Sequence, residues 1–121
     1  MFMKKVILVT IATIFTIVLS DCKKDSTTYD CTGVTATYTT HVKPILDTKC
    51  AGYGCHSPGA GLGNNISLMS FESAKSEAAQ ARFMGAVEHR SGFDAMPKGR
   101  SKLSDAELKT LGCWIKANYP Q

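Results

Sequence analysis

Hydrophobic residues gather first at the amino end of the chain, where residues 6–19 form an apolar run broken only by threonines. Lys4 and Lys5 stand directly before this run. A positively charged start followed by a short apolar stretch is typical of a secretory signal peptide. A membrane-spanning anchor is the alternative, but the run is shorter than the roughly 20 residues that a spanning helix needs. The pattern therefore predicts a signal peptide over residues 1–21 and an exported protein.

The next stretch has the opposite character. Residues 22–38 are polar, rich in threonine and aspartate, and contain few apolar side chains. A segment of this composition buries too little apolar surface to fold by itself. We expect a flexible polar tether here, fixed at one point by Cys31, followed by a single domain over residues 39–121.

Helical periodicity starts near Thr40. With Thr40 as N-cap, Pro44 would fall in the first turn, where its missing N–H costs little. One apolar stripe follows at helical spacing, formed by Val42, Ile45 and Leu46. Residues 50–65 are rich in glycine and therefore predict a loop.

Two further helical regions follow the loop. The alanine-rich residues 71–84 predict a helix capped by Ser70, with a shorter helical piece continuing to His89. Residues 91–102 contain glycines and a proline and predict irregular structure.

The last helix has the clearest boundaries. Ser104 and Glu107 match a capping box, and Leu103 and Leu108 match the hydrophobic staple that accompanies it. Its buried stripe is expected to consist of Leu108, Leu111 and Ile115, with Trp114 at the side and Pro120 after the end. No alternating pattern is long enough for a strand, so the predicted fold class is all-α.

The charge of the chain gives no indication of a nucleic-acid partner. The 121 residues carry a net charge of +4, and removal of the predicted signal peptide takes away two lysines and one aspartate. The remaining positive charge is weak, and no basic stripe interleaved with aromatic residues occurs. We therefore expect no nucleic-acid binding.

The segment Cys50-Ala51-Gly52-Tyr53-Gly54-Cys55-His56 carries the candidate chemistry. Two thiols with a histidine directly after the second suit covalent haem attachment, in which each thiol adds across one vinyl group and the histidine ligates the iron. Four residues separate the cysteines instead of the usual two. Gly52 and Gly54 would supply the backbone freedom for the longer loop.

From these residues the chain resembles the class I monohaem cytochromes c, among whose relatives a four-residue spacing also occurs. The resemblance covers roughly residues 39–120. It includes the helix before the attachment motif, the Met96-Pro97 dipeptide, and Leu103-Ser104-Asp105-Ala106-Glu107-Leu108 leading into a helix with Trp114-Ile115. It implies a bundle of three to four helices around one haem c. Met96 would be the second axial ligand, and Trp114 or Tyr119 would pack where the last helix crosses the first.

Other interpretations of these residues remain open. Cys50 and Cys55 could form a disulfide beside a bystander His56, or the three residues could join another His or Cys in a zinc site. His89 competes with Met96 as sixth ligand. Met69 and Met84 are expected to pack in the core or haem pocket, and His41 is expected at the surface.

The other cysteines suggest two further modifications. Leu19-Ser20-Asp21-Cys22 resembles a lipoprotein signal, although Asp21 departs from the small uncharged residue normal there, and this predicts lipidation of Cys22. Ordinary signal-peptidase cleavage nearby is the alternative. We expect Cys31 and Cys113 to form a disulfide that holds the tether on the last helix, although each could instead be free.

With His56 and Met96 both on the iron, no coordination position is open for a substrate, and such a site transfers electrons. We therefore expect an electron carrier rather than an enzyme. It would work with redox partner proteins as a periplasm-facing or outer-membrane lipoprotein, held at the membrane by its lipid. The alternatives are a haem enzyme or gas sensor with an open sixth position, and a non-haem module held together by disulfides.

Overall fold

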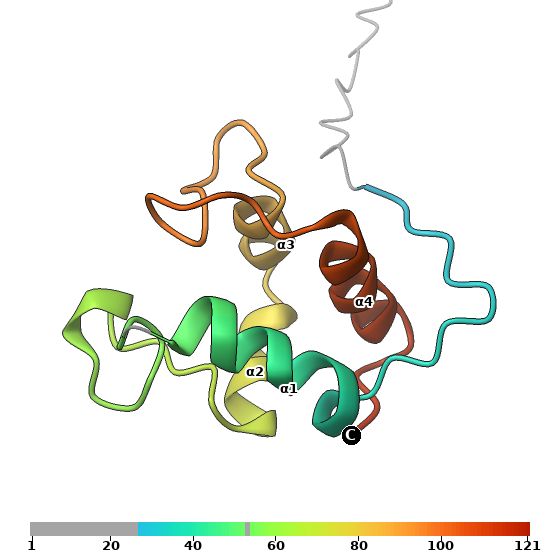
Figure 1. The fold of residues 1–121 in the computed structure, drawn as a ribbon, viewed down its shortest axis with the longest axis horizontal. Coiled ribbons are helices and arrows are strands. Elements are labelled where there is room, and N and C mark those ends of the chain that lie inside the picture. The colour runs from blue at the N-terminus through green and yellow to red at the C-terminus, as the bar shows by residue number, and fades with distance from the viewer. Residues whose placement is uncertain (1–26, 53) are drawn as a thin grey trace, which may run out of the picture.

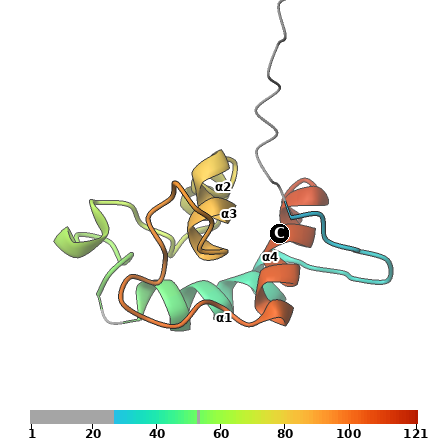
Figure 2. The same cartoon turned by 90° about the horizontal axis from the view of Figure 1, so that it is seen from above.

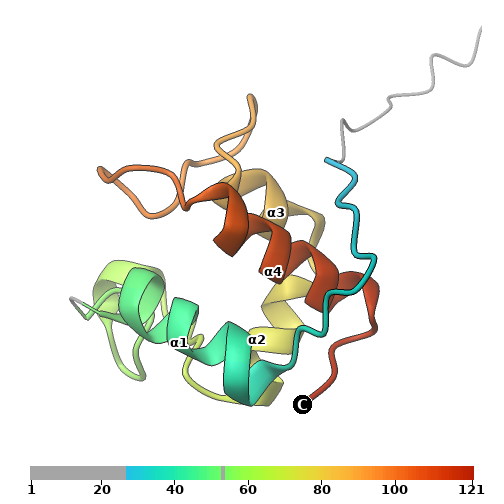
Figure 3. The same ribbon diagram turned by 45° about the vertical axis from the view of Figure 1, so that its right-hand side comes forward.

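The computed structural model describes residues 27–52 and 54–121 of the chain, and Figures 1–3 show them from three sides. Helices joined by turns and loops make up this part of the chain, and no β-strand occurs in it. The predicted all-α class is therefore confirmed.

The first helical segment is continuous but changes its hydrogen-bond type along its length. It consists of η1 (Tyr38–Val42), α1 (Lys43–Ile45) and η2 (Leu46–Ala51), of which η1 and η2 are π-helical. The wider turns are visible in bonds from the amide of Val42 to the carbonyl of Thr37, 3.1 Å, and from Gly52 to Asp47, 2.7 Å. Wider turns suit Pro44, which has no N–H to donate to an ordinary helical bond.

The start of this segment differs from the expectation. The helix begins at Tyr38 with Thr37 as N-cap, so Thr40 does not cap it and Pro44 lies beyond the first turn. Packing explains the earlier start. The Tyr38 ring is only 5% exposed and lies 5.3 Å from the Phe71 ring and 6.0 Å from the Trp114 ring, measured between centroids.

The single helix expected over residues 71–84 is two helices. α2 (Phe71–Ala78) and α3 (Ala81–Val87) are separated at Gln80, which has an extended backbone with ψ of 133°. The reason lies in the buried positions, Ala74 and Ala78 in α2 and Phe83 and Val87 in α3. Each pair has helical spacing, but in one continuous helix the two pairs would face different directions. The break at Gln80 lets both pairs of buried side chains face the core.

α2 begins where the sequence predicted. Ser70 caps it, and the Ser70 and Ser73 side chains form a reciprocal capping box.

α4 (Asp105–Lys116) begins with the predicted capping box of Ser104 and Glu107. It packs against η1 and crosses the first helical segment steeply, as Figure 2 shows. Trp114 lies at the centre of this crossing with no exposed surface, and its ring contacts those of Tyr38 and Tyr119. Trp114 therefore belongs to the buried face of α4, whereas Ile115 lies at its edge.

The core joins the first helical segment to α4. Its most deeply buried side chains are Val42, Leu46, Leu111, Cys113 and Trp114. Met84 packs against this core, as expected. Met69 is 37% exposed, so it does not pack in the core, which was one of its two expected places: it follows Leu68, whose buried side chain occupies the inward position.

Residues 27–37, which we call the strap, run past α4 to the first helical segment (Figures 1 and 3). A disulfide joins Cys31 to Cys113 with an S–S distance of 2.08 Å, which is the pairing expected from the sequence. The strap is held at more than the one expected point, because Ala36 is also buried in the core. At the other end of the chain, the Pro120 carbonyl accepts bonds from the amide of Tyr38 and the indole of Trp114, both 2.9 Å.

Candidate functional site

Cys50 lies at the end of the first helical segment, in η2, and is only 8% exposed. Its thiol is free, and so is that of the half-buried Cys55. Burial raises the pKa of Cys50 to about 11, and the nearby Glu107 carboxylate adds to this shift. The structure therefore does not support a Cys50–Cys55 disulfide, and the buried sulfur is kept as a neutral thiol.

The chain after Cys50 turns back on itself. The amide of His56 donates to the carbonyl of Cys50, 3.2 Å, and the amide of Gly54 donates to the carbonyl of Ala51, 3.1 Å. Gly54 has a φ of +70°, a left-handed conformation that glycine adopts without strain. The longer spacing between the cysteines is thus accommodated in a turn whose two ends are hydrogen-bonded to each other.

His56 is oriented by the chain that follows it. Its Nδ1 lies 2.9 Å from the carbonyl oxygen of Ile66, and its own carbonyl accepts from the amide of Leu68, 2.9 Å. A carbonyl can only accept, so Nδ1 carries a proton, and in the neutral imidazole the lone pair is then on Nε2. Histidines that bind metals are commonly held in this way through their other nitrogen.

Gly63 makes this approach possible. It belongs to the short 3-10 helix η3 (Gly61–Gly63). A Cβ at this position would lie 1.9 Å from the carbonyl oxygen of Cys55 and 2.9 Å from Nδ1 of His56. No other residue type fits there unless the Cys55–His56 backbone moves.

Met96 lies in the loop between α3 and α4, which we call the Met96 loop. Hydrogen bonds connect this loop to the end of α3. The amide of Met96 donates to the carbonyl of Ala86, 3.0 Å, and the peptide between Met96 and Pro97 is cis. Met96 is half-buried. The ring of Phe93 lies against Gly85, where a Cβ would be only 2.6 Å from it.

His89 is engaged differently from His56. It follows α3 with a φ of +55°, and its Nε2 lies 3.1 Å from the carbonyl oxygen of Met96. Nε2 therefore donates to Met96, and a ligand role through this nitrogen would require the bond to break. His41 is exposed, as expected, and its Nδ1 accepts from the amide of Thr37, 3.2 Å.

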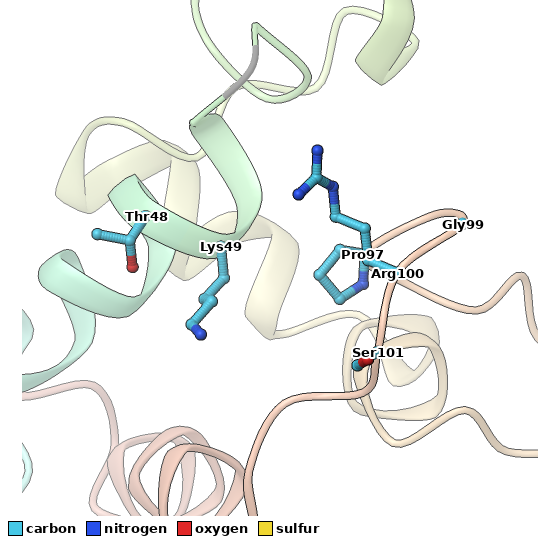
Figure 4. A pocket seen from close by; sticks show the side chains of 6 residues that line it. All are labelled: Thr48, Lys49, Pro97, Gly99, Arg100 and Ser101. Carbon is cyan, nitrogen blue, oxygen red and sulfur yellow. The ribbon is translucent and has the colours of Figure 1, made fainter.

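A cavity of about 780 Å³ lies between the first helical segment and the loop after Met96 (Figure 4). Thr48 and Lys49 line it on the helical side, directly before Cys50. The opposite wall consists of Pro97, Gly99, Arg100 and Ser101. Such a volume is typical of cofactor and small-molecule sites. The cavity thus separates the residue before Cys50 from the residue after Met96.

The cavity wall is cationic, a feature that the sequence does not predict. Figure 4 shows the Lys49 and Arg100 side chains on its two sides. Lys49 also lies 3.5 Å from the carboxylate of Glu107 in α4. Nothing in the local sequence signals that Lys49 and Arg100 face one space, because they lie on segments far apart in the chain.

Across residues 27–52 and 54–121, no three His, Cys, Asp or Glu side chains form a metal-binding group, so this part of the chain offers no support for a zinc site. The predicted signal peptide, residues 1–21, and the predicted lipidation site, Cys22, lie outside the described residues. In the described part of the chain, no helix has the length and apolar character to cross a membrane.

No protein family model, no curated protein and no solved structure matches the chain.

Proposed function

We propose that the chain is a small c-type cytochrome that carries single electrons, with one haem held covalently and a fold related to the class I cytochromes c. The orientation of His56 is the observation that carries this proposal. A histidine directly after a free cysteine has its Nδ1 held by a backbone carbonyl, which leaves the lone pair of Nε2 to bind a metal.

Each residue of the motif has a role in this proposal. The Cys50 and Cys55 thiols would hold the porphyrin as thioethers, because addition of each S–H across one vinyl group needs no oxidant. His56 and Met96 would hold the haem iron. When bound, the haem iron provides reversible one-electron oxidation and reduction.

The residues around Met96 support a carrier rather than a catalyst. Met96 is bonded through its amide, and its carbonyl accepts from His89, so the main chain on both sides of the side chain is fixed. A fixed methionine competes well with external ligands, because little conformational freedom is lost when it binds. We include in the proposal the exported, lipid-anchored location and a redox protein as partner.

Spectra of the purified protein test the function. The protein is made in a host with cytochrome c maturation, then oxidised, reduced and exposed to carbon monoxide. A carrier shows a six-coordinate low-spin spectrum that carbon monoxide does not change. Rapid carbon monoxide binding would instead indicate an open iron and a sensor or enzyme. The His56→Ala variant is expected to lose the low-spin spectrum, and an unaltered spectrum would contradict the role of His56.

A further inference from the structure

The strap is attached to α4 at two neighbouring residues. Cys31 is bonded to Cys113 by the disulfide. The ring of Tyr29 lies on Gly112, where a Cβ would be only 2.2 Å from the ring. Because Gly112 and Cys113 are adjacent in α4, the strap is fixed in both position and direction.

Tyr29 then connects the strap to the end of α3. Its hydroxyl donates to Oε1 of Glu88 at 2.5 Å, across 59 residues of sequence. The other carboxylate oxygen of Glu88 accepts from Nε of Arg90. The side chains of Glu88 and Arg90 are only 6% and 19% exposed, respectively. Burial and the bond to Glu88 both raise the pKa of Tyr29, so the phenol remains a donor at neutral pH.

The turn that Glu88 begins also holds the Met96 loop. Glu88 is followed by His89, whose Nε2 donates to the carbonyl of Met96, 3.1 Å. The amide of Met96 donates to Ala86, 3.0 Å, and that of Arg90 donates to Gly85, 2.9 Å. A continuous set of contacts therefore runs from the disulfide through Tyr29 and Glu88 to Met96.

We propose that the strap is a positioning device for the sixth ligand, with Tyr29 as the positioning residue that holds the turn at Glu88 and thereby the Met96 loop. The proposal rests on the proposed function, because it assumes that Met96 ligates the iron. Loss of the Tyr29 hydroxyl leaves Oε1 of the buried Glu88 carboxylate without its hydrogen-bond donor. Opening of the turn lets water solvate this oxygen, so the loss of the donor favours the open turn. An opened turn releases the His89 bond to Met96.

The Tyr29→Phe variant tests this inference, because it keeps the ring on Gly112 and removes only the hydroxyl. Tyr38→Phe is the matched control, since the buried hydroxyl of Tyr38 has no hydrogen-bond partner. Amide hydrogen exchange and carbon monoxide binding are compared in the haem-loaded proteins.

In Tyr29→Phe we expect exchange at the Met96 and Arg90 amides to accelerate on the order of tenfold, the size expected for a lost bond to a buried charged group. Carbon monoxide binding accelerates with it, and the methionine–iron charge-transfer band weakens. The Tyr38→Phe protein keeps the parent behaviour. A Cys31→Ser, Cys113→Ser double variant moves in the same direction as Tyr29→Phe.

Unchanged exchange at Met96 in Tyr29→Phe overturns the inference. Faster exchange with unchanged carbon monoxide binding overturns it as well, because the turn would then not control the ligand. Absence of covalent haem in the parent protein is recognised from its spectrum before any variant is compared, and it refutes the proposed function together with the ligand role of Met96.

Discussion

The two histidines near the candidate site differ in the ring nitrogen that is engaged. His56 has Nδ1 bonded to a carbonyl, and His89 has Nε2 bonded to one. In the proposed function this difference corresponds to different tasks: His56 presents Nε2 to the iron, whereas His89 holds the main chain of Met96. While this bond holds, Nδ1 is the ring nitrogen of His89 that is left for a metal, and the proposed function assigns the sixth position to Met96.

Replacement of Met96 tests that assignment. Met96→Ala is expected to keep the haem, because the thioethers are untouched, but to lose the methionine–iron charge-transfer band and to open the iron to carbon monoxide. Met69→Ala is the control, since Met69 is partly exposed. If Met96→Ala keeps the parent spectrum and His89→Ala loses the low-spin signature, His89 is the ligand. If neither changes the coordination, the iron is five-coordinate.

The buried thiol of Cys50 predicts a pH dependence for the haem-free chain. Its pKa is about 11 in the folded protein, compared with 9.0 as the ordinary value. Above the ordinary pKa the unfolded chain loses this proton first, so stability is full below about pH 9 and falls by on the order of 2–3 kcal/mol by about pH 11. Urea unfolding at both ends of this range measures the loss.

The control for this measurement is Cys50→Ala, which retains the other titrating groups and is expected to lose less stability over the same range. The haem-loaded protein is also expected to lack the Cys50 contribution, because its sulfur is a thioether. Equal losses in the haem-free parent and in Cys50→Ala would contradict the assigned burial of the thiol.

Among the elements, those with local signals were predictable from the sequence and those set by tertiary packing were not. α4 begins at its predicted cap because Ser104 and Glu107 are three residues apart and their bonds form within one turn. The break at Gln80 has no local signal, because it depends on the direction in which α2 and α3 face the core. The early start at Tyr38 likewise depends on Phe71 and Trp114.

The same distinction applies to the site. Short motifs in the sequence predict the site residues Cys50, Cys55, His56 and Met96. They do not predict the carbonyl that orients His56, because it belongs to Ile66, ten residues away. The Tyr29–Glu88 bond joins segments with no common pattern, so only the folded chain brings these residues together.

The cap of α4 provides a test at the scale of the element. The Ser104 hydroxyl accepts from the amide of Glu107, 3.3 Å, and the Glu107 carboxylate accepts from the amide of Ser104, 2.8 Å. Ser104→Ala is expected to lower the free energy of unfolding by about 1 kcal/mol. Chemical denaturation measures the difference, and the exposed Ser91→Ala serves as control. Equal stability of the two variants would contradict the capping role.

At the scale of the whole molecule, three long-range connections join segments that are distant in the sequence. The disulfide closes a sequence separation of 82 residues, the Pro120 carbonyl holds the start of the first helical segment, and Tyr29 holds the end of α3. The disulfide and Tyr29 join the strap to α4 and to the end of α3, and Pro120 joins the carboxyl end of the chain to the helical segment that contains Cys50. The proposed function thus depends on the closed molecule as well as on the attachment motif.

The most direct measurement of the central claim is haem retention under denaturing conditions. The chain is produced with cytochrome c maturation, boiled in detergent, separated on a gel and stained for haem, and its intact mass is determined. We predict that the band stains and that the mass increases by one haem. The Cys50→Ala, Cys55→Ala double variant should lose both signals, while the Cys31→Ser, Cys113→Ser variant should retain them. An unstained parent band, or a double variant that stains as strongly as the parent, would contradict covalent attachment at Cys50 and Cys55.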